Sequence, residues 1–293
     1  MFVFQILLNS LVTSTQVLLL AAGLYLVYAV ARFQHIALGA IATASAYAFL
    51  SAQSLTGAPW LSFIIGMAVS GLLSYLSFFV LRKYIDHSQD LLALLVSLTL
   101  GVCLESIIGI AYGPEGRFLV PEVLPVYQLA GLHLTQVGLW TIAIGLFVAL
   151  LTYIALHLLP LGRLVRAISQ HRECATIMGI NTQHIRRLVF VVAGILVGIV
   201  GMLSGLNNAV TPTSGLLPII TAFIALMVGG VTDFRGTAVA TFILVLLPEL
   251  IVSLQIGGLT ISVSWKMVIV FLLALCLLMI RPRGLFHSLN RNN

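Results

Sequence analysis

Nine long apolar runs divide almost the whole chain, and they constrain its fold more than any other feature. They cover roughly residues 5–31, 33–52, 60–81, 91–111, 137–159, 188–209, 217–231, 236–254 and 265–280. Most approach the roughly 20 apolar residues that a bilayer span takes. A transmembrane barrel would instead show alternating segments of about ten residues. The sequence therefore predicts an all-α polytopic membrane protein with eight or nine spans.

Composition agrees with a membrane-embedded chain. Apolar residues make up 60% of the 293 residues and charged residues only 8%, whereas about 25% of a soluble globular chain is charged. The sequence contains no linker or soluble domain, so residues 1–293 are expected to form a single transmembrane domain. The three scattered cysteines indicate neither a disulfide framework nor a metal site.

The basic residues indicate the orientation, because Lys and Arg favour the cytoplasmic side of a membrane. If the N-terminus lies outside, all of them except Arg117 and Lys266 fall in cytoplasmic segments. They separate apolar runs instead of clustering on a soluble face, so nucleic acid is not an expected partner. The sequence predicts an external N-terminus and a cytoplasmic C-terminus.

Two of the runs, 33–52 and 217–231, are short and adjoin glycines. Paired, glycine-interrupted short segments are typical of discontinuous helices beside the substrate path of transporters. The alternative is two turns that use glycine for backbone freedom. Whether 217–231 crosses the membrane or is re-entrant is left open. The residues of the candidate pathway are His35, Gly39, Gly229, Gly230 and Asp233.

Residues suited to catalysis are scarce. Neither lysine follows a glycine, so the chain has no phosphate-binding loop of its own. We identify no catalytic residue and no metal-ligand set, and do not expect an enzyme. Glu105 lies within a predicted span and Glu249 near the end of another, and either a helix contact or a transport role is open for both. For Asp233, an ion pair with Arg235 is the competing interpretation.

A glycine stripe runs along the sixth apolar segment. Gly194, Gly198, Gly201 and Gly205 recur at steps of four, three and four residues, which places them on one helical face. Such a stripe lets another helix approach closely. The sequence therefore predicts close packing here, inside the subunit or between subunits.

The longest internal segment, 160–187, contains a candidate amphipathic helix at 166–179. Three of its apolar residues recur at offsets of seven and three, its arginines lie elsewhere on the surface, and a glycine ends it. Because the apolar face lacks Trp and Phe, docking to a soluble partner is favoured over burial in membrane lipid. The residues of this candidate docking helix are Arg166, Ala167, Ile168, Arg172, Ala175, Met178 and Gly179.

Several of these stretches resemble the branched-chain amino acid ABC transporter permeases. The resemblance covers most of the chain and is strongest from 160 to 286. It is carried by Gly162-Arg163, Arg166-Ala167, Ala175 and Met178-Gly179-Ile180-Asn181, by Ala222-Phe223, Val228-Gly229-Gly230 and Gly236, by Ile280-Arg281-Pro282-Arg283-Gly284-Leu285-Phe286, and near the start by Val27-Tyr28, Ala37, Gly39 and Tyr47.

The resemblance implies a permease subunit in the bacterial inner membrane that binds no cofactor itself, because ATP is bound by a partner. In the family, two homologous permeases pair, two ATPase subunits dock beneath them, and an external binding protein delivers substrate. Whether the two permeases here are identical is open. The segment 166–179 would be the coupling helix that enters the ATPase groove.

The chain departs from the family at both candidate pathway segments. The family's Asn-Phe-Ala-His-Gly-Glu becomes His35-Ile36-Ala37-Leu38-Gly39-Ala40, and the Gly-rich segment 229–236 also differs. The resemblance implies a branched-chain or other apolar amino acid as the substrate, and these departures keep urea or short amides open as the alternative. A stand-alone secondary carrier is the alternative of another class.

Overall fold

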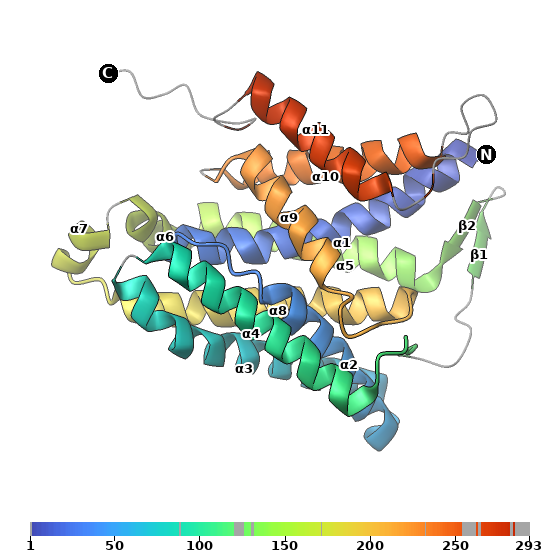
Figure 1. Cartoon of the computed structure of the whole chain (residues 1–293), viewed down its shortest axis with the longest axis horizontal. Coiled ribbons are helices and arrows are strands. Elements are labelled where there is room, and N and C mark those ends of the chain that lie inside the picture. Colours follow the sequence, from blue (N-terminus) through green and yellow to red (C-terminus); the bar gives the residue numbers. More distant parts are fainter. Residues whose placement is uncertain are drawn as a thin grey trace.

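The computed structural model of the chain describes residues 2–87, 89–119, 126–129, 132–170, 172–231, 233–253, 262, 265–281 and 284. Within these ranges the chain is mainly helical (Figure 1). The elements are α1 (Phe2–Ala31), α2 (Leu38–Thr56), α3 (Pro59–Asp86), α4 (Asp90–Tyr112), β1 (Val126–Leu129), β2 (Leu132–Thr135), α5 (Gln136–His157), α6 (Pro160–Gln170), α7 (Arg172–Ile177), α8 (Thr182–Asn207), α9 (Leu216–Gly229), α10 (Phe234–Ser253) and α11 (Lys266–Ile280).

Each of the nine apolar runs corresponds to a helix, and the helical prediction is confirmed. Six helices in the described ranges, α1, α3, α4, α5, α8 and α10, are long and apolar enough to cross a membrane. The apolar helices α9 and α11 are shorter, and α2 is rich in Ala, Ser and Thr. The structure thus supports six spans by length and hydropathy, and the larger number of eight or nine stays a prediction.

A small hairpin is an exception to the all-α prediction. Strands β1 and β2 pair antiparallel within the segment between α4 and α5. Just before the hairpin, the backbones of Arg117 and Val210 exchange hydrogen bonds of 3.0 and 2.8 Å. This bridge joins the segment after α4 to the segment between α8 and α9.

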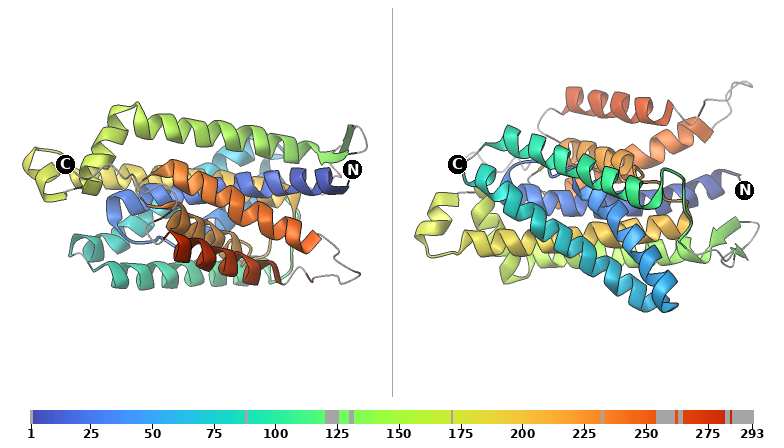
Figure 2. Two further views of the ribbon diagram at one scale, coloured as in Figure 1. Left: turned by 90° about the horizontal axis from the view of Figure 1, so that it is seen from above. Right: turned by 60° about the horizontal axis from the view of Figure 1, so that its bottom comes forward.

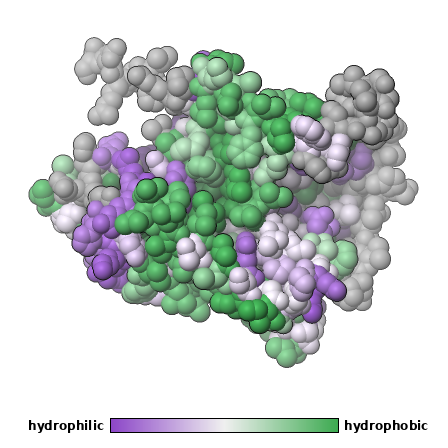
Figure 3. All heavy atoms as spheres, in the orientation of Figure 1, coloured by the Kyte–Doolittle hydropathy of each residue, from purple (hydrophilic) through white to green (hydrophobic). Residues whose placement is uncertain are grey.

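The helices form an elongated bundle with two distinct ends (Figures 1 and 2). Helix α1 begins at the end that carries the hairpin and finishes near α6 and α7 at the other. Helices α1 and α8 are the most enclosed, whereas only 22% of the α4 span is buried. Figure 3 shows apolar residues across the middle of the molecule and hydrophilic residues toward the α6–α7 end.

The glycine stripe of α8 is a packing face inside the subunit, as predicted. A Cβ added at Gly201 would lie only 1.8 Å from the carbonyl oxygen of Ala42 in α2, and one at Gly198 would lie 2.1 Å from Oγ of Ser70 in α3. Ser45 Oγ also donates a hydrogen bond of 2.8 Å to the Gly198 carbonyl. Helices α2, α3 and α8 therefore pack backbone to backbone.

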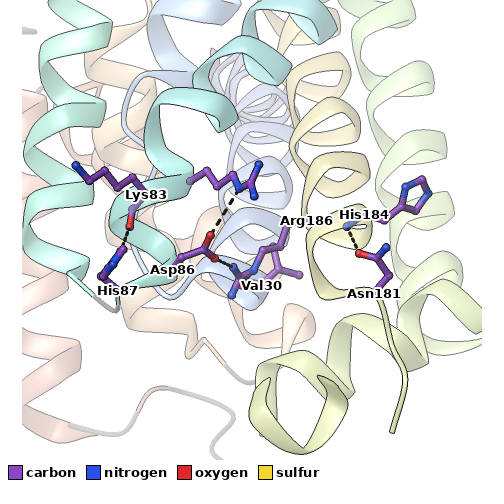
Figure 4. A network of polar contacts seen from close by, with 8 residues as sticks. Val30, Lys83, Asp86, His87, Asn181, His184 and Arg186 are labelled. Atoms are coloured by element: carbon purple, nitrogen blue, oxygen red, sulfur yellow. Dashed lines mark hydrogen bonds and ion pairs between the residues drawn. The ribbon is translucent and has the colours of Figure 1, made fainter. Parts of the chain in front are cut away.

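A buried ion pair joins three helix ends beside α6 (Figure 4). Nη1 of Arg186, in α8, lies 3.0 Å from Oδ1 of Asp86, the last residue of α3. The Arg186 side chain is only 3% exposed, and its Nε donates to the carbonyl of Val30 in α1 at 3.2 Å. The more exposed Arg82 lies 3.7 Å from the same carboxylate. The sequence indicated Arg186 only as an orientation signal.

Replacing Arg186 by Met should destabilise the protein by about 3 kcal/mol, because removing one partner leaves a buried charge uncompensated. The change is measured as a lower midpoint of thermal unfolding in detergent. Arg82→Gln is the matched control, since a half-exposed pair contributes at most about 1 kcal/mol. Equal effects of the two variants would contradict the conclusion that Arg186 forms the buried, stabilising ion pair.

Gly201→Ala should destabilise the protein by about 1–3 kcal/mol, because one methyl group must push α2 and α8 apart. Gly109→Ala is the control, because its added Cβ would meet nothing nearer than 3.9 Å and alanine favours a helix over glycine. We expect Gly109→Ala to be neutral or stabilising in the same unfolding measurement. A neutral Gly201→Ala would show that the helices are not in close contact there.

Candidate functional site

The predicted docking helix 166–179 falls in α6 and α7. Helix α6 covers Pro160–Gln170 and α7 covers Arg172–Ile177. Ile168 in α6 and Ala175 in α7 are both buried. Position 171 and the Arg172 side chain lie outside what the structure describes.

The two short helices have a buried side and an exposed tip. Val165, Ile168 and Ala175 pack into the main core, whereas Arg166 is exposed and Ala167 half-buried. Met178 was expected to share one helical face with Ile168 and Ala175, but those two are buried and Met178 is 72% exposed. It follows Ile177, which is 84% exposed. The tip of α7 therefore presents two uncovered apolar side chains.

Gly179 ends α7, as predicted. Its φ is +81°, in the left-handed region that favours glycine. Its N–H donates to the Thr176 carbonyl at 3.0 Å, and the Ile180 N–H donates to the Ala175 carbonyl at 3.1 Å. This pair of bonds is the Schellman arrangement of a helix C-terminus. Asn181 then caps α8 by accepting from the His184 N–H at 3.1 Å. The Gly-Ile-Asn turn is thus fixed at both sides.

The segment between α1 and α2 is tied to α6. Arg32 has φ +63°, the left-handed region, although it is not glycine, and its guanidinium donates to the carbonyl of Ser169 in the last turn of α6. A pocket of about 170 Å³ lies beside this contact. It is lined in part by Arg32, Asp90, Ile168 and Arg186. Helix α6 is therefore bonded to the end of α1 and also borders empty space.

His35 is fully buried in a chain of hydrogen bonds. The Ala37 N–H donates to Ser97 Oγ at 3.2 Å, and Ser97 Oγ lies 2.7 Å from Nδ1 of His35. On the other side, Nε2 lies 3.0 Å from Ser77 Oγ, which donates to the Ser74 carbonyl at 2.7 Å. Because the Ser77 hydroxyl proton is used there, its oxygen accepts from Nε2–H and Nδ1 accepts from Ser97. His35 thereby joins the start of α2 to α3 and α4.

Gly39 lies where α2 crosses the start of α9. A Cβ added at Gly39 would lie 2.7 Å from the Gly215 carbonyl oxygen, and one added at Gly215 would lie 2.0 Å from that of Gly39. Gly215 was not among the residues that the sequence indicated. The signal that could have indicated it is its position just before a short apolar run and after Pro212-Thr213-Ser214.

Gly229, Gly230 and Asp233 form the turn between α9 and α10. A Cβ at Gly229 would lie 2.4 Å from the backbone of Gly236, and Gly230 has φ +97°. Asp233 Oδ1 accepts from the Arg235 backbone N–H at 3.0 Å at the start of α10. The Arg235 guanidinium donates to the Tyr153 hydroxyl of α5. The expected Asp233–Arg235 ion pair is therefore a helix cap instead.

The structure brings the candidate pathway residues together only in part. His35 and Gly39 share one segment, while Gly229, Gly230 and Asp233 lie at the other end of α9. Nε2 of Gln34 lies 4.0 Å from Sδ of Met227, so the segment 34–39 lies against α9 near both its ends. The two candidate pathway segments are thus linked through α9, because 34–39 lies against this helix and Gly229 and Gly230 lie at its end.

The intramembrane acids differ in their partners. Glu249 forms an ion pair with Lys266 across α10 and α11. Among the residues that the structure describes, Glu105 has neither an ion pair nor a hydrogen bond. The same residues contain no cluster of three His, Cys, Asp or Glu side chains that could hold a metal ion.

Known proteins match this chain over most of its length. It is 29% identical over 251 residues to the probable branched-chain amino acid transport permease protein LivH of Methanocaldococcus jannaschii, covering 82% of this chain and 78% of that protein. It is 23% identical to the high-affinity branched-chain amino acid transport system permease protein LivH of Escherichia coli (70% and 67% covered). BraD of Pseudomonas aeruginosa, of the same description, is 22% identical (96% and 94% covered).

A solved structure shares the fold. The structure of PsaBC from Streptococcus pneumoniae in complex with a Fab superposes with a TM-score of 0.52 at 16% identity, covering 94% of this chain and 91% of that one. Residues 6–278 match the family described as the branched-chain amino acid transport system permease component. The chain therefore belongs to this family and is a multi-pass membrane permease component, not an enzyme.

Proposed function

We propose that this chain is the transmembrane subunit of an ABC importer for branched-chain or other apolar amino acids. A separate ATPase supplies the energy, so this chain needs no cofactor. The complex contains a second homologous permease, two ATPase subunits and an external substrate-binding protein, in the inner membrane of a bacterium. The relatives' names support amino acids over urea or short amides as the substrate.

The observation that carries this proposal is the tip of α7. Ile177 and Met178 are 84% and 72% exposed, and hydrophilic residues gather toward the α6–α7 end in Figure 3. Exposed apolar side chains rimmed by polar ones are typical of a protein interface. A flexible methionine suits a groove on a partner.

The charges support an orientation with the α6–α7 end in the cytoplasm and the N-terminus outside. Arg32, Arg82 and Arg186 meet near α6, whereas Arg117 lies at the segment between α8 and α9. Such an asymmetry follows the preference of basic residues for the cytoplasmic side.

Labelling of Cys174 tests the orientation. In a Cys103→Ser, Cys276→Ser background expressed without ATPase, an impermeant maleimide should label Cys174 only after permeabilisation. Cys174 is exposed in α7, so the reagent can reach it. A Leu55→Cys variant, also carrying Cys174→Ser, places a thiol at the exposed far end of α2 and should be labelled in intact cells. Labelling of Cys174 in intact cells would reverse the orientation.

The docking role is tested at Met178 rather than at Ala175. Ala175 is 1% exposed, so a bulky residue there would disturb the packing of α7 against the core. Met178→Asp should weaken retention of the ATPase about tenfold or more, since a charge would replace an apolar anchor. Met178→Leu should retain it. The measurement is ATPase co-purification together with ATP-driven uptake.

His184→Ala is the control for this experiment, because only the His184 backbone N–H takes part in the α8 cap. It should leave attachment unchanged. If Met178→Asp co-purifies with as much ATPase as the wild type, the tip of α7 is not the docking element.

A further inference from the structure

Glu105 stands out because nothing in the described chain neutralises it. It lies about two turns before the end of α4 and is half-buried. The carboxylates of Asp86 and Glu249 have basic partners, and that of Asp233 caps a helix. A carboxyl group inside a membrane span is costly, and such groups usually mark a substrate or ion path.

Gly101 and Gly109, one turn before and one turn after Glu105, show which elements lie next to this face of α4. Residues four apart share a helical face, so Gly101, Glu105 and Gly109 lie along one side of α4. A Cβ at Gly101 would lie 3.3 Å from Cα of Ala37, and one at Gly109 would lie 3.9 Å from Cγ of Pro212. Glu105 is therefore placed between the start of α2 and the turn that precedes α9.

This is also the place where the two short helices cross. Gly39 and Gly215 are in backbone contact, and the buried Thr43 hydroxyl donates to the Gly39 carbonyl at 3.3 Å. A Cβ added at Gly39 would also lie 2.8 Å from Cγ2 of Ile219, so the residues at the crossing are closely packed, and apart from the Thr43 hydroxyl its side chains are apolar.

The nearest arginine after α4 is Arg117, and its guanidinium donates to the Tyr112 carbonyl at 2.7 Å. Residues 33–56 and 188–234 contain neither Lys nor Arg, and α4 contains none. The positive partner of Glu105 must therefore come from outside these segments. An α-ammonium group carries a full positive charge and three N–H donors, which is the complement of one carboxylate.

We infer that Glu105 binds the α-ammonium group of the amino-acid substrate as it passes the crossing of α2 and α9. This inference rests on the proposed function. The apolar residues of the crossing suit an aliphatic side chain, while the carboxylate selects against molecules that lack the ammonium group. A charge-assisted contact of this kind is stronger than a neutral hydrogen bond.

The first experiment is transport by the purified complex in proteoliposomes. Glu105→Gln keeps the shape of the side chain and removes its charge. The maximal rate of leucine uptake should fall about tenfold or more, with the half-saturating concentration of loaded binding protein unchanged. Glu105→Asp should retain part of the uptake. Ser106→Ala, one position along α4 and turned about 100° away, should transport normally.

The second experiment measures binding of radiolabelled leucine to the purified permease without its partners. Isoamylamine, which keeps the ammonium group, should compete, and 4-methylpentanoate, which lacks it, should not. Glu105→Gln should abolish the difference between the two competitors. This measurement of leucine binding does not depend on ATP. A failure of the proposed importer function would be seen in the uptake experiment instead, as the absence of ATP-driven uptake by the wild type.

Three results would overturn the inference. Normal uptake by Glu105→Gln is one, and equal competition by both analogues at the wild-type permease is another. The third is dissociation of two permease subunits in Glu105→Gln on size-exclusion chromatography, which would make Glu105 a contact between permeases instead.

Discussion

The close approach of α2, α3 and α8 is the contact on which the rest of the structure depends. In a bilayer the hydrophobic effect does not drive helices together, and packing and interhelical hydrogen bonds must do so. Gly198 and Gly201 bring backbones into contact, and Ser45 and Ser74 each donate to a carbonyl of α8. With these three helices fixed, α2 can be short and begin inside the bundle without losing its position.

The hydrogen-bond chain through His35 fixes where α2 begins. Its partners Ser77 and Ser97 belong to α3 and α4, so the backbone of the incoming segment is bonded although it lies outside a helix. Unpaired backbone groups in a membrane are costly, and irregular segments persist there only inside protein or beside a water-filled path. The segment 33–37 meets this condition, and it leaves Gly39 free to cross Gly215.

Sequence patterns predicted the features that depend on local chemistry. Hydropathy located each apolar helix, the glycine spacing predicted the packing face of α8, and Gly179 predicted the end of α7. Features that depend on distant partners were missed. No local pattern reveals that Arg186 reaches Asp86 or that Gly39 meets Gly215. Met178 fitted the period of Ile168 and Ala175, but it follows the last residue of α7 and its side chain is exposed.

The contacts of Arg32 connect the two candidate sites. Its guanidinium is bonded to the C-terminal turn of α6, where a positive group is favoured by the helix dipole, and its backbone begins the segment that leads to α2. A non-glycine residue in the left-handed region costs about 1 kcal/mol or more. The surrounding structure holds Arg32 there while a pocket beside α6 leaves room for displacement. A shift of α6 imposed at the tip of α7 would therefore act first on residue 32, and through the segment 33–37 on the crossing of α2 and α9. The short segment 32–39 thus contacts α6, next to the docking element, at one end and the crossing beside the proposed ammonium site at the other.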